Sequence, residues 1–337
     1  MGLGLRTRTQ TQYSRKGGHT VDTSLLKYIA KRLALTVPVL IGITILTFLL
    51  VNVAPGDVVD VLLGDKGTEE GRALIERQLN LDKPLATRYL LWMGRVVRGD
   101  LGTSYITHKE VLPTILRRAV ITGEIGLLAF IFALLGALPL GVLSATNRNG
   151  WIDHLARVVA LTGISIPSFW LAIIFLLVFC VILGWFPTGG FVPLSKGLWA
   201  NLRSVFLPAA ILGFVNMGSV TRMLRAGMIE SLSANYVDTA RAMGIREKII
   251  VWNDALKNAF IPTLTVIGIA FALVLSGSIL VETVFSIPGL GRLVAESVFN
   301  RDLPLIQGVL LTVGTIYVFV NLLVDVLYTF LDPRIKY

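Results

Sequence analysis

The chain has 337 residues, of which 54% are hydrophobic and 15% charged, and its formal net charge is +10. Soluble domains average about 25% charged residues, so this composition excludes an ordinary soluble protein and indicates a bilayer as solvent. The single cysteine excludes a disulfide framework. With one cysteine and three histidines, the chain has few ligands for a zinc cluster. Because Lys and Arg flank the apolar runs, the positive charge indicates membrane topology rather than nucleic-acid binding.

Six uncharged apolar runs meet or approach the length of about 20 residues that a transmembrane helix needs. They cover residues 33–56, 125–147, 158–195, 204–221, 258–281 and 303–324. The third run is too short for two spans and a turn, and its stretch from Trp185 to Gly190 is typical of an interfacial loop. We therefore end that span near Gly184 and predict six spans, with both termini on one side.

The distribution of basic residues predicts the orientation. With the N-terminus in the cytoplasm, the inner side holds 17 Lys and Arg residues and the outer side four, leaving aside segment 57–118. That segment is not counted, because long loops cross the membrane largely regardless of charge. Both termini are therefore expected to be cytoplasmic. Residues 1–24 are polar and basic without a cleavage pattern, which predicts a cytoplasmic tail followed by an uncleaved insertion signal.

The outer segment, residues 57–118, carries helix signals. Thr68 precedes two acids at one predicted helix start, and Asp82 and Pro84 open a second helix with an apolar stripe. The stripe comprises Leu85, Tyr89, Trp92 and Val96. Two interpretations stay open for this segment: a small cap on the outer membrane face, or a surface that contacts a partner delivering cargo.

The inner loop, residues 222–258, is too polar for the bilayer and too patterned for a linker. A short helix is predicted over Ser231–Met243, ended by Gly244, the residue that most easily takes the left-handed conformation after a helix. A second amphipathic helix is predicted from Arg246, and Pro262 then marks the entry into the fifth span. Such a helical pair either docks to an attached protein or lies on the lipid surface.

Several motifs of this chain resemble those of permease subunits of ATP-binding-cassette importers. Asp238-Thr239-Ala240, followed after three residues by Gly244, resembles their EAA-loop signature. The flanking text, from Tyr236 to Pro262, is similar to the dipeptide, oligopeptide and nickel branch, especially its B-type permeases. Further motifs lie along residues 25–337: Ala54-Pro55-Gly56-Asp57, Gly99-Asp100-Leu101-Gly102-Thr103-Ser104, Leu138-Pro139-Leu140-Gly141, Ser165-Ile166-Pro167-Ser168-Phe169-Trp170, Glu282-Thr283-Val284-Phe285-Ser286-Ile287-Pro288-Gly289-Leu290-Gly291 and Asp332-Pro333-Arg334.

The resemblance implies an all-α membrane protein of the type I importer architecture, with a polar tail over residues 1–24 and a permease domain over 25–337. It implies a homologous second permease, two ATPase subunits that bind the ATP, and an extracytoplasmic solute-binding protein, in a bacterial or archaeal cytoplasmic membrane. The coupling residues it implies are Tyr236, Asp238, Thr239, Ala240, Ala242, Gly244 and Ile245. Two departures weaken the signature: Asp238 and Thr239 replace its glutamate and first alanine, and Pro262 lies far beyond Gly244.

Acids beside apolar spans are functional candidates, because a charge at membrane depth is costly. Glu124 is interpreted mainly as a boundary residue and Asp325 as a packing or interfacial one. Glu282 either pairs structurally, contacts an outer partner, or binds a cationic group of the cargo. Of the prolines inside spans, Pro167 is the best candidate for a bend near a pathway, together with Phe169 and Trp170.

We find no P-loop, zinc-protease or nucleophile-elbow motif in the sequence, so an enzyme is not expected and no cofactor is predicted for this chain. The favoured function is therefore a permease that imports peptides by alternating access, powered by separate ATPase subunits. The rival is an ion-coupled transporter that would use Glu124, Glu282 or Asp325 as proton carriers. The cargo stays open among peptides, nickel chelates, glutathione and oligosaccharides.

Overall fold

The structure of the protein is a computed structural model that describes residues 23–53, 59, 68–78 and 81–331. Within these ranges the regular structure is helical, with one isolated bridge between Thr103 and Glu110, so the predicted all-α class is confirmed. The long helices are α1 (Thr23–Val53), α5 (Val111–Thr146), α8 (Leu198–Leu232), α11 (Leu256–Val284) and α13 (Leu303–Leu331). The shorter ones are α3 (Glu69–Gln78), α4 (Leu85–Val96), α6 (Trp151–Ser165), α7 (Ser168–Phe175), η2 (Leu176–Ile182), η3 (Leu194–Lys196), α9 (Asn235–Ala242), α10 (Glu247–Ile249), η4 (Ile250–Ala255) and α12 (Leu290–Phe299).

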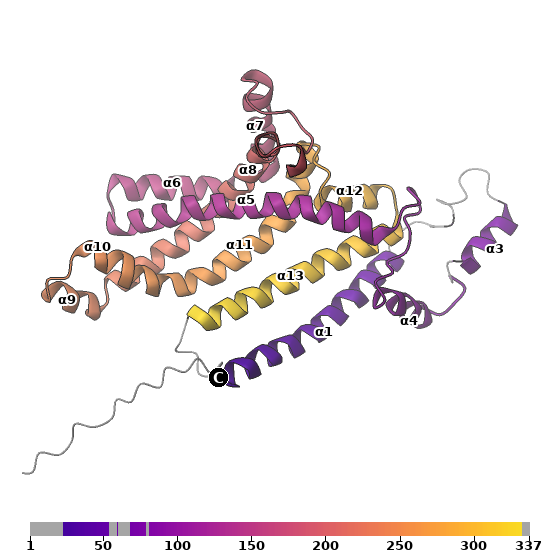
Figure 1. The fold of residues 1–337 in the computed structure, drawn as a ribbon, viewed down its shortest axis with the longest axis horizontal. Helices are drawn as coiled ribbons and strands as arrows, with labels where there is room; N and C mark the ends of the chain where they lie inside the picture. Colours follow the sequence, from indigo (N-terminus) through magenta and orange to yellow (C-terminus); the bar gives the residue numbers. More distant parts are fainter. Residues whose placement is uncertain (1–22, 54–58, 60–67, 79–80, 332–337) are drawn as a thin grey trace, which may run out of the picture.

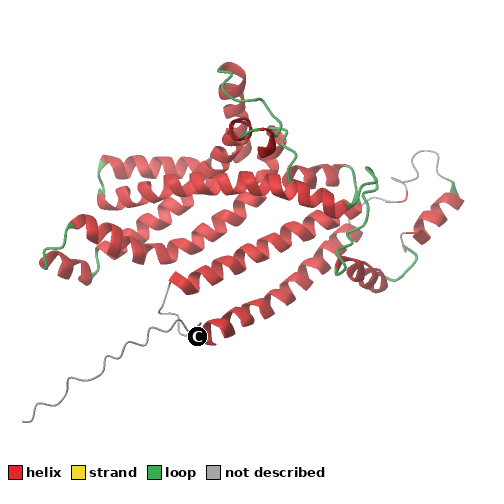
Figure 2. Ribbon diagram, viewed as in Figure 1, coloured by secondary structure: helices red, strands yellow, loops and turns green. Residues whose placement is uncertain are grey.

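The long helices form a bundle in which α8 packs along α5 and α11, while α1 packs along α13 at one edge (Figure 1). Helices α9 and α10 lie at one end of this bundle, together with the start of α1 and the end of α13. Helices α4 and α12 lie at the opposite end, and α7 projects from the bundle's side (Figure 2). The two ends of the described bundle therefore differ: one bears α9 and α10, and the other bears the outer segment.

The number of membrane crossings agrees with the prediction, but the third crossing is not straight. Among the described residues, five helices are each long and apolar enough to span a bilayer. Helices α6 and α7 with η2 form a pair bent by 101°, which makes six crossings when it is counted as one broken span. The bend falls at Ile166 and Pro167, where Ile166 is extended with ψ 124° and Pro167 has φ −61°. A proline pushes the residue before it out of the helical region, so the predicted bend at Pro167 is confirmed.

Small residues let the central helices approach closely. A Cβ atom on Gly213 of α8 would lie 2.7 Å from the Ala129 carbonyl oxygen of α5. On the neighbouring face, a Cβ atom on Gly218 would lie 2.3 Å from the Ala160 oxygen of α6. In a bilayer, helix association depends on such packing rather than on hydrophobic burial. We conclude that α5, α6 and α8 form one tightly packed body.

The structure corrects three boundaries of the inner loop. Helix α8 continues to Leu232, so the polar loop begins about ten residues later than predicted, and Ser231 belongs to α8 rather than to the next helix. The second helix does begin after Arg246, as predicted. It runs through the π-helical turn η4 into α11, so Pro262 lies inside a continuous helix instead of at its entry. Polarity alone missed these boundaries because both spans project beyond their apolar parts.

The two predicted helices of the outer segment are present as α3 and α4. Thr68 caps α3 by accepting a hydrogen bond from the Gly71 amide at 3.2 Å. On α4, Tyr89 and Trp92 pack against Phe48 near the outer end of α1. Leu85, predicted to share this stripe, is instead 52% exposed. Val96 packs against the same cluster, so the segment is anchored to the bundle through the last three residues of its stripe.

Candidate functional site

The end of the bundle that bears α9 and α10 carries a two-helix projection, which we call the elbow and define as residues 235–255. Gly244 lies between α9 and α10 with φ +77°, which confirms the predicted left-handed glycine. The Gly244 amide donates to the Arg241 carbonyl at 2.9 Å, and the Ile245 amide donates to the Ala240 carbonyl at 3.1 Å. These two bonds satisfy carbonyl groups at the end of α9 and reverse the chain direction within three residues.

The elbow has its own small core and its own ion pair. Val237, Ala240 and Ile250 form a buried apolar cluster between the two helices. Arg241 grips Glu247 through two hydrogen bonds of 2.7 and 3.1 Å, and this contact raises the pKa of Arg241 above its usual value. Because the core joins α9 to η4 and the ion pair joins α9 to α10, these helices are expected to move as one body.

Most of the remaining predicted coupling residues lie on the surface of the elbow. Asp238, Thr239 and Ala242 are exposed, whereas Ala240 belongs to the buried cluster. Tyr236 is 41% exposed, and its hydroxyl accepts a hydrogen bond from the Asn258 amide at 3.2 Å. The elbow also exposes four large apolar side chains: Met243, Ile245, Ile249 and Trp252. Exposed apolar side chains that gather on one surface are typical of a protein or membrane contact.

An ion pair that sequence analysis missed locks the helices above the elbow. Asp153 of α6 is fully buried and accepts two hydrogen bonds from Arg225 of α8, at 2.8 and 2.9 Å. Ser144 of α5 and the Asn149 amide donate to the same carboxylate at 2.6 and 3.0 Å. This bidentate, fully bonded arrangement is the geometry in which a buried ion pair holds elements together. His154, next to Asp153 in the chain, is exposed, and its ring lies 3.1 Å from Arg157.

At the opposite end, Glu282 caps helix α12. Its side chain is 1% exposed, and its carboxylate accepts hydrogen bonds from the Thr122 hydroxyl at 2.7 Å and the Arg292 amide at 2.9 Å. Thr122 also accepts from the Leu290 amide at 2.7 Å, so both side chains satisfy free amides in the first turn of α12. A Cβ atom on Gly289 would lie 2.4 Å from either carboxylate oxygen, which explains the glycine.

This placement corrects one prediction about Glu282. A direct contact to cargo or to an outer partner requires an exposed carboxylate, but the carboxylate is enclosed and bonded to the chain's own groups. Structural pairing, the other alternative, agrees with the geometry. Glu124 also has an internal partner, because the Asn201 amide donates to it at 2.6 Å. Asp325 belongs to α13, and its side chain is outside the described part of the structure.

The candidate pathway residues follow the bend of the third crossing. Phe169 and Trp170 begin α7 directly after Pro167 and are 43% and 50% exposed. Their exposure leaves them available for lipid, a partner or a pathway, and a pathway role stays a prediction. The motifs Ala54–Asp57 and Asp332–Arg334 and the tail before residue 23 lie outside the described residues.

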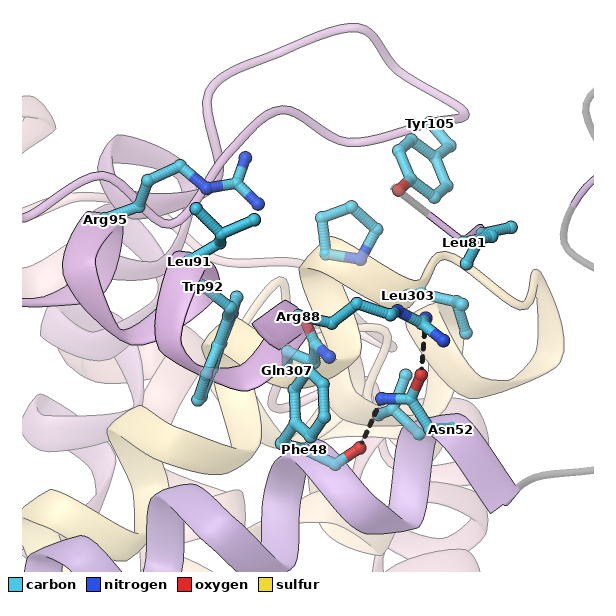
Figure 3. A pocket seen from close by; sticks show the side chains of 12 residues that line it. Phe48, Asn52, Leu81, Arg88, Leu91, Trp92, Arg95, Tyr105, Leu303 and Gln307 are labelled. Atoms are coloured by element: carbon cyan, nitrogen blue, oxygen red, sulfur yellow. Dashed lines mark hydrogen bonds between the residues drawn. The ribbon is translucent and has the colours of Figure 1, made fainter. Parts of the chain in front are cut away.

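The outer segment and the bundle enclose a small pocket of about 90 Å³, shown in Figure 3. Arg88 of α4 reaches into it and donates to the Asn52 side chain at 2.6 Å, while Tyr105 and Arg95 line other walls (Figure 3). Desolvation lowers the pKa of Arg88 and raises the pKa of Tyr105. The pocket is far below the roughly 300–1,000 Å³ of ligand sites, so it has room for one small group only. Among the described residues, no cluster of three or more His, Cys, Asp or Glu could hold a metal.

Comparisons with known proteins give a consistent result. Residues 137–337 match the model of the binding-protein-dependent transport system inner membrane component, and residues 25–125 match the model of the N-terminal part of such components. A putative peptide transport system permease of Brucella abortus is 40% identical, with 92% of this chain and 98% of that protein covered. The dipeptide transport system permease of Escherichia coli is 37% identical, covering 93% and 99%. The oligopeptide transport system permease of Bacillus subtilis is 36% identical, covering 92% and 99%.

A solved structure supports the fold. The chain resembles a chain of the inward-facing MetNI methionine ABC transporter with a TM-score of 0.56 and 17% identity. The match covers 66% of this chain and 98% of the other. At this identity the likeness concerns the fold alone, and it agrees with the type I importer architecture that the motifs implied.

Proposed function

This chain belongs to the family of binding-protein-dependent transport system inner membrane components, and from that premise we propose that it is the permease subunit of an ATP-driven peptide importer. The observation that carries the proposal is the set of peptide permeases at 36–40% identity, each covered over almost its whole length. Nickel chelates, glutathione and oligosaccharides remain alternative cargoes, and peptide is favoured because all three relatives are named for peptide transport.

The proposed assembly contains a second, homologous permease, two ATPase subunits and an extracytoplasmic solute-binding protein. Family membership supports the binding protein, and the absence of a P-loop in the sequence assigns ATP to other chains. The membrane is the cytoplasmic membrane of a bacterium or archaeon. We place the elbow and both termini in the cytoplasm, in keeping with the 17 basic residues on that side.

In the proposed mechanism, each ATPase subunit grips an elbow. The exposed apolar side chains of the elbow, among them Met243 and Trp252, supply the contact surface. Closure of the ATPase pair around nucleotide would push the elbow. Because α8 leads into α9, and η4 leads into α11, the push reaches two spans directly. Asp153 and Arg225 would pass it on to α6, so that the helices turn as rigid bodies and open the cavity alternately to each side.

On the outer face, we propose that the outer segment receives the solute-binding protein. The support is geometric, since α4 and α12 both lie at the end opposite the elbow (Figure 1). Leu90 and Phe299 are 69% and 86% exposed on these two helices. An ion-coupled transporter is disfavoured, because Glu282, one of its predicted proton carriers, serves as an internal helix cap.

The test has two steps. Gentle affinity purification of the full chain should recover a second permease and an ATPase, identified by mass spectrometry. The recovered complex, reconstituted in proteoliposomes with the solute-binding protein outside, should accumulate a labelled dipeptide only when ATP is supplied at the elbow side. Uptake driven by a pH gradient from this chain alone would refute the proposal in favour of the ion-coupled rival.

A further inference from the structure

A second and larger cavity lies between α6, α8 and α11, in the half of the bundle that bears the elbow. Its volume is about 680 Å³, within the range of sites that hold small-molecule ligands. Most of its lining is apolar: Leu161 and Ile164 come from α6, Met223 from α8 and Val266 from α11. The cavity therefore has both the size and the walls to take a compact ligand with apolar side chains.

Three arginines converge on this apolar cavity: Arg157, Arg222 and Arg225. Arg225 donates hydrogen bonds from two of its guanidinium nitrogens to Asp153. Arg157 lies 3.4 Å from the same carboxylate. The Asp153 carboxylate thus pairs with two of the three guanidinium groups. Arg222 is exposed and lines the cavity, and within the described part of the chain it has no ion-pair or hydrogen-bond partner. The cavity carries an excess of positive charge next to apolar walls, where an unpaired charge is costly.

A second observation independently points to an anionic ligand. The Nε atom of Arg157 is buried and has no hydrogen-bond partner. Buried donors in folded proteins are almost always bonded to protein, water or ligand, so this donor calls for an acceptor. The carboxylate of Asp153 is already occupied by Arg225, Ser144 and the Asn149 amide. An acceptor for the Nε atom of Arg157 and for Arg222 would therefore be a water or a ligand.

We propose that this cavity binds the C-terminal carboxylate of the peptide cargo, with the peptide's side chains against the apolar walls. The proposal rests on the proposed function and names the chemical group by which the permease itself holds its cargo. Arg222 is the principal anion-binding residue, because it is the guanidinium of the cavity lining that has no partner among the described residues. Since Arg225 lies on α8 only seven residues before that helix ends at the elbow, an occupied cavity is also close to the coupling surface.

A phospholipid headgroup is the competing occupant, since basic pockets between membrane helices on the cytoplasmic side also bind anionic lipids. The cavity favours the peptide because it is walled on three sides. Helices α6 and α8 are in tight contact beside it, where a Cβ atom on Gly163 would lie 2.7 Å from the Phe214 carbonyl oxygen. The cavity also has the volume of a compact ligand rather than that of a groove for two acyl chains.

The test uses a cysteine in the cavity as a reporter in the purified complex. Cys180 is the chain's single cysteine, so Cys180→Ala with Ser219→Cys leaves one thiol, at an exposed position in the cavity wall. The rate of thiol labelling of this chain is followed by mass spectrometry. Leucyl-alanine should slow the labelling, and leucyl-alanine amide, which lacks the carboxylate, should need a roughly tenfold higher concentration, equivalent to about 1.4 kcal/mol.

Arg222→Gln should weaken the binding of leucyl-alanine roughly tenfold and leave the binding of leucyl-alanine amide unchanged, which removes the difference between the two ligands. Arg222→Lys should restore most of the difference. Arg148→Gln is the matched control, because Arg148 is an exposed arginine on the same side of the bundle and outside the cavity lining. Equal protection by both dipeptides, or an equal effect of the control, would overturn the proposal. So would native mass spectra in which Arg222→Gln loses a bound phospholipid without any difference between the dipeptides.

The same complex separates this inference from the proposed function. If the unmodified complex imports dipeptides in proteoliposomes but the cavity shows no preference for the carboxylate, only the inference fails. If it imports no peptide although the cavity thiol is protected by the acid dipeptide, the proposed function fails and the carboxylate site stands.

Discussion

Replacing Gly244 by valine tests whether the elbow transmits force. Gly244 has φ +77°, a conformation that costs a residue with a side chain roughly 1–2 kcal/mol, and a β-branched one at least that much. No atom lies within 4 Å of the position its Cβ would take, so the effect of the substitution comes from the backbone and not from a clash. The elbow at this point is closed by two amide hydrogen bonds, each contributing about 0.5–1.5 kcal/mol.

The strain is thus comparable to what holds the turn closed, and a change of one or two kcal/mol alters a population ratio by a factor of roughly 5–30. We expect Gly244→Val to reduce peptide-stimulated ATP hydrolysis by the reconstituted complex at least about fivefold. The amount of inserted chain and the basal ATPase rate should stay unchanged, because the strain is confined to an exposed turn.

Gly244→Asn is the matched control. Asparagine tolerates the left-handed region better than other residues with a side chain, so this variant should retain most of the stimulated rate. If the valine variant kept the stimulation of the unmodified complex, or if both variants lost it equally, the elbow would not be the coupling element that we propose.

Three further substitutions test the packing. Gly289→Ala would place a Cβ atom 2.4 Å from the carboxylate oxygens of Glu282, so we expect its melting temperature to fall by several degrees. Gly123→Ala, at an open position on α5, should leave the melting temperature unchanged or raise it. Equal melting temperatures for the two variants would contradict the capping role of Glu282. Asp153→Asn removes the buried partner of Arg225 and should destabilise the chain by roughly 3–5 kcal/mol, measured by denaturant unfolding in detergent, and a loss below about 1 kcal/mol would contradict the lock. Trp92→Ala should increase protease cleavage within the outer segment, because Trp92 anchors that segment, while removing the exposed Trp199 should not.

Local patterns along the chain were enough to predict several elements. Runs of apolar residues predict the membrane crossings because each helix must cover its own length of bilayer. The bend at Pro167 and the left-handed Gly244 follow from the backbone restrictions of single residues, and both are present. The motif around Gly244 also led to the permease family, which the family models then confirmed. These features depend on neighbours in the sequence, so sequence analysis could find them.

The pairing of distant groups was decided by the tertiary structure. Thr122 and Glu282 are 160 residues apart, and Asp153 and Arg225 are 72 apart, so their contacts depend on how two helices are rotated and set against each other. The hydropathy pattern placed Glu282 at the outer end of a span but did not predict its hydrogen-bond partner. It did not predict the burial of Asp153 either, because a single acid beside a polar turn is usually solvated. A charged residue near the membrane can therefore be recognised in the sequence. The group that neutralises it is determined only when the helices pack.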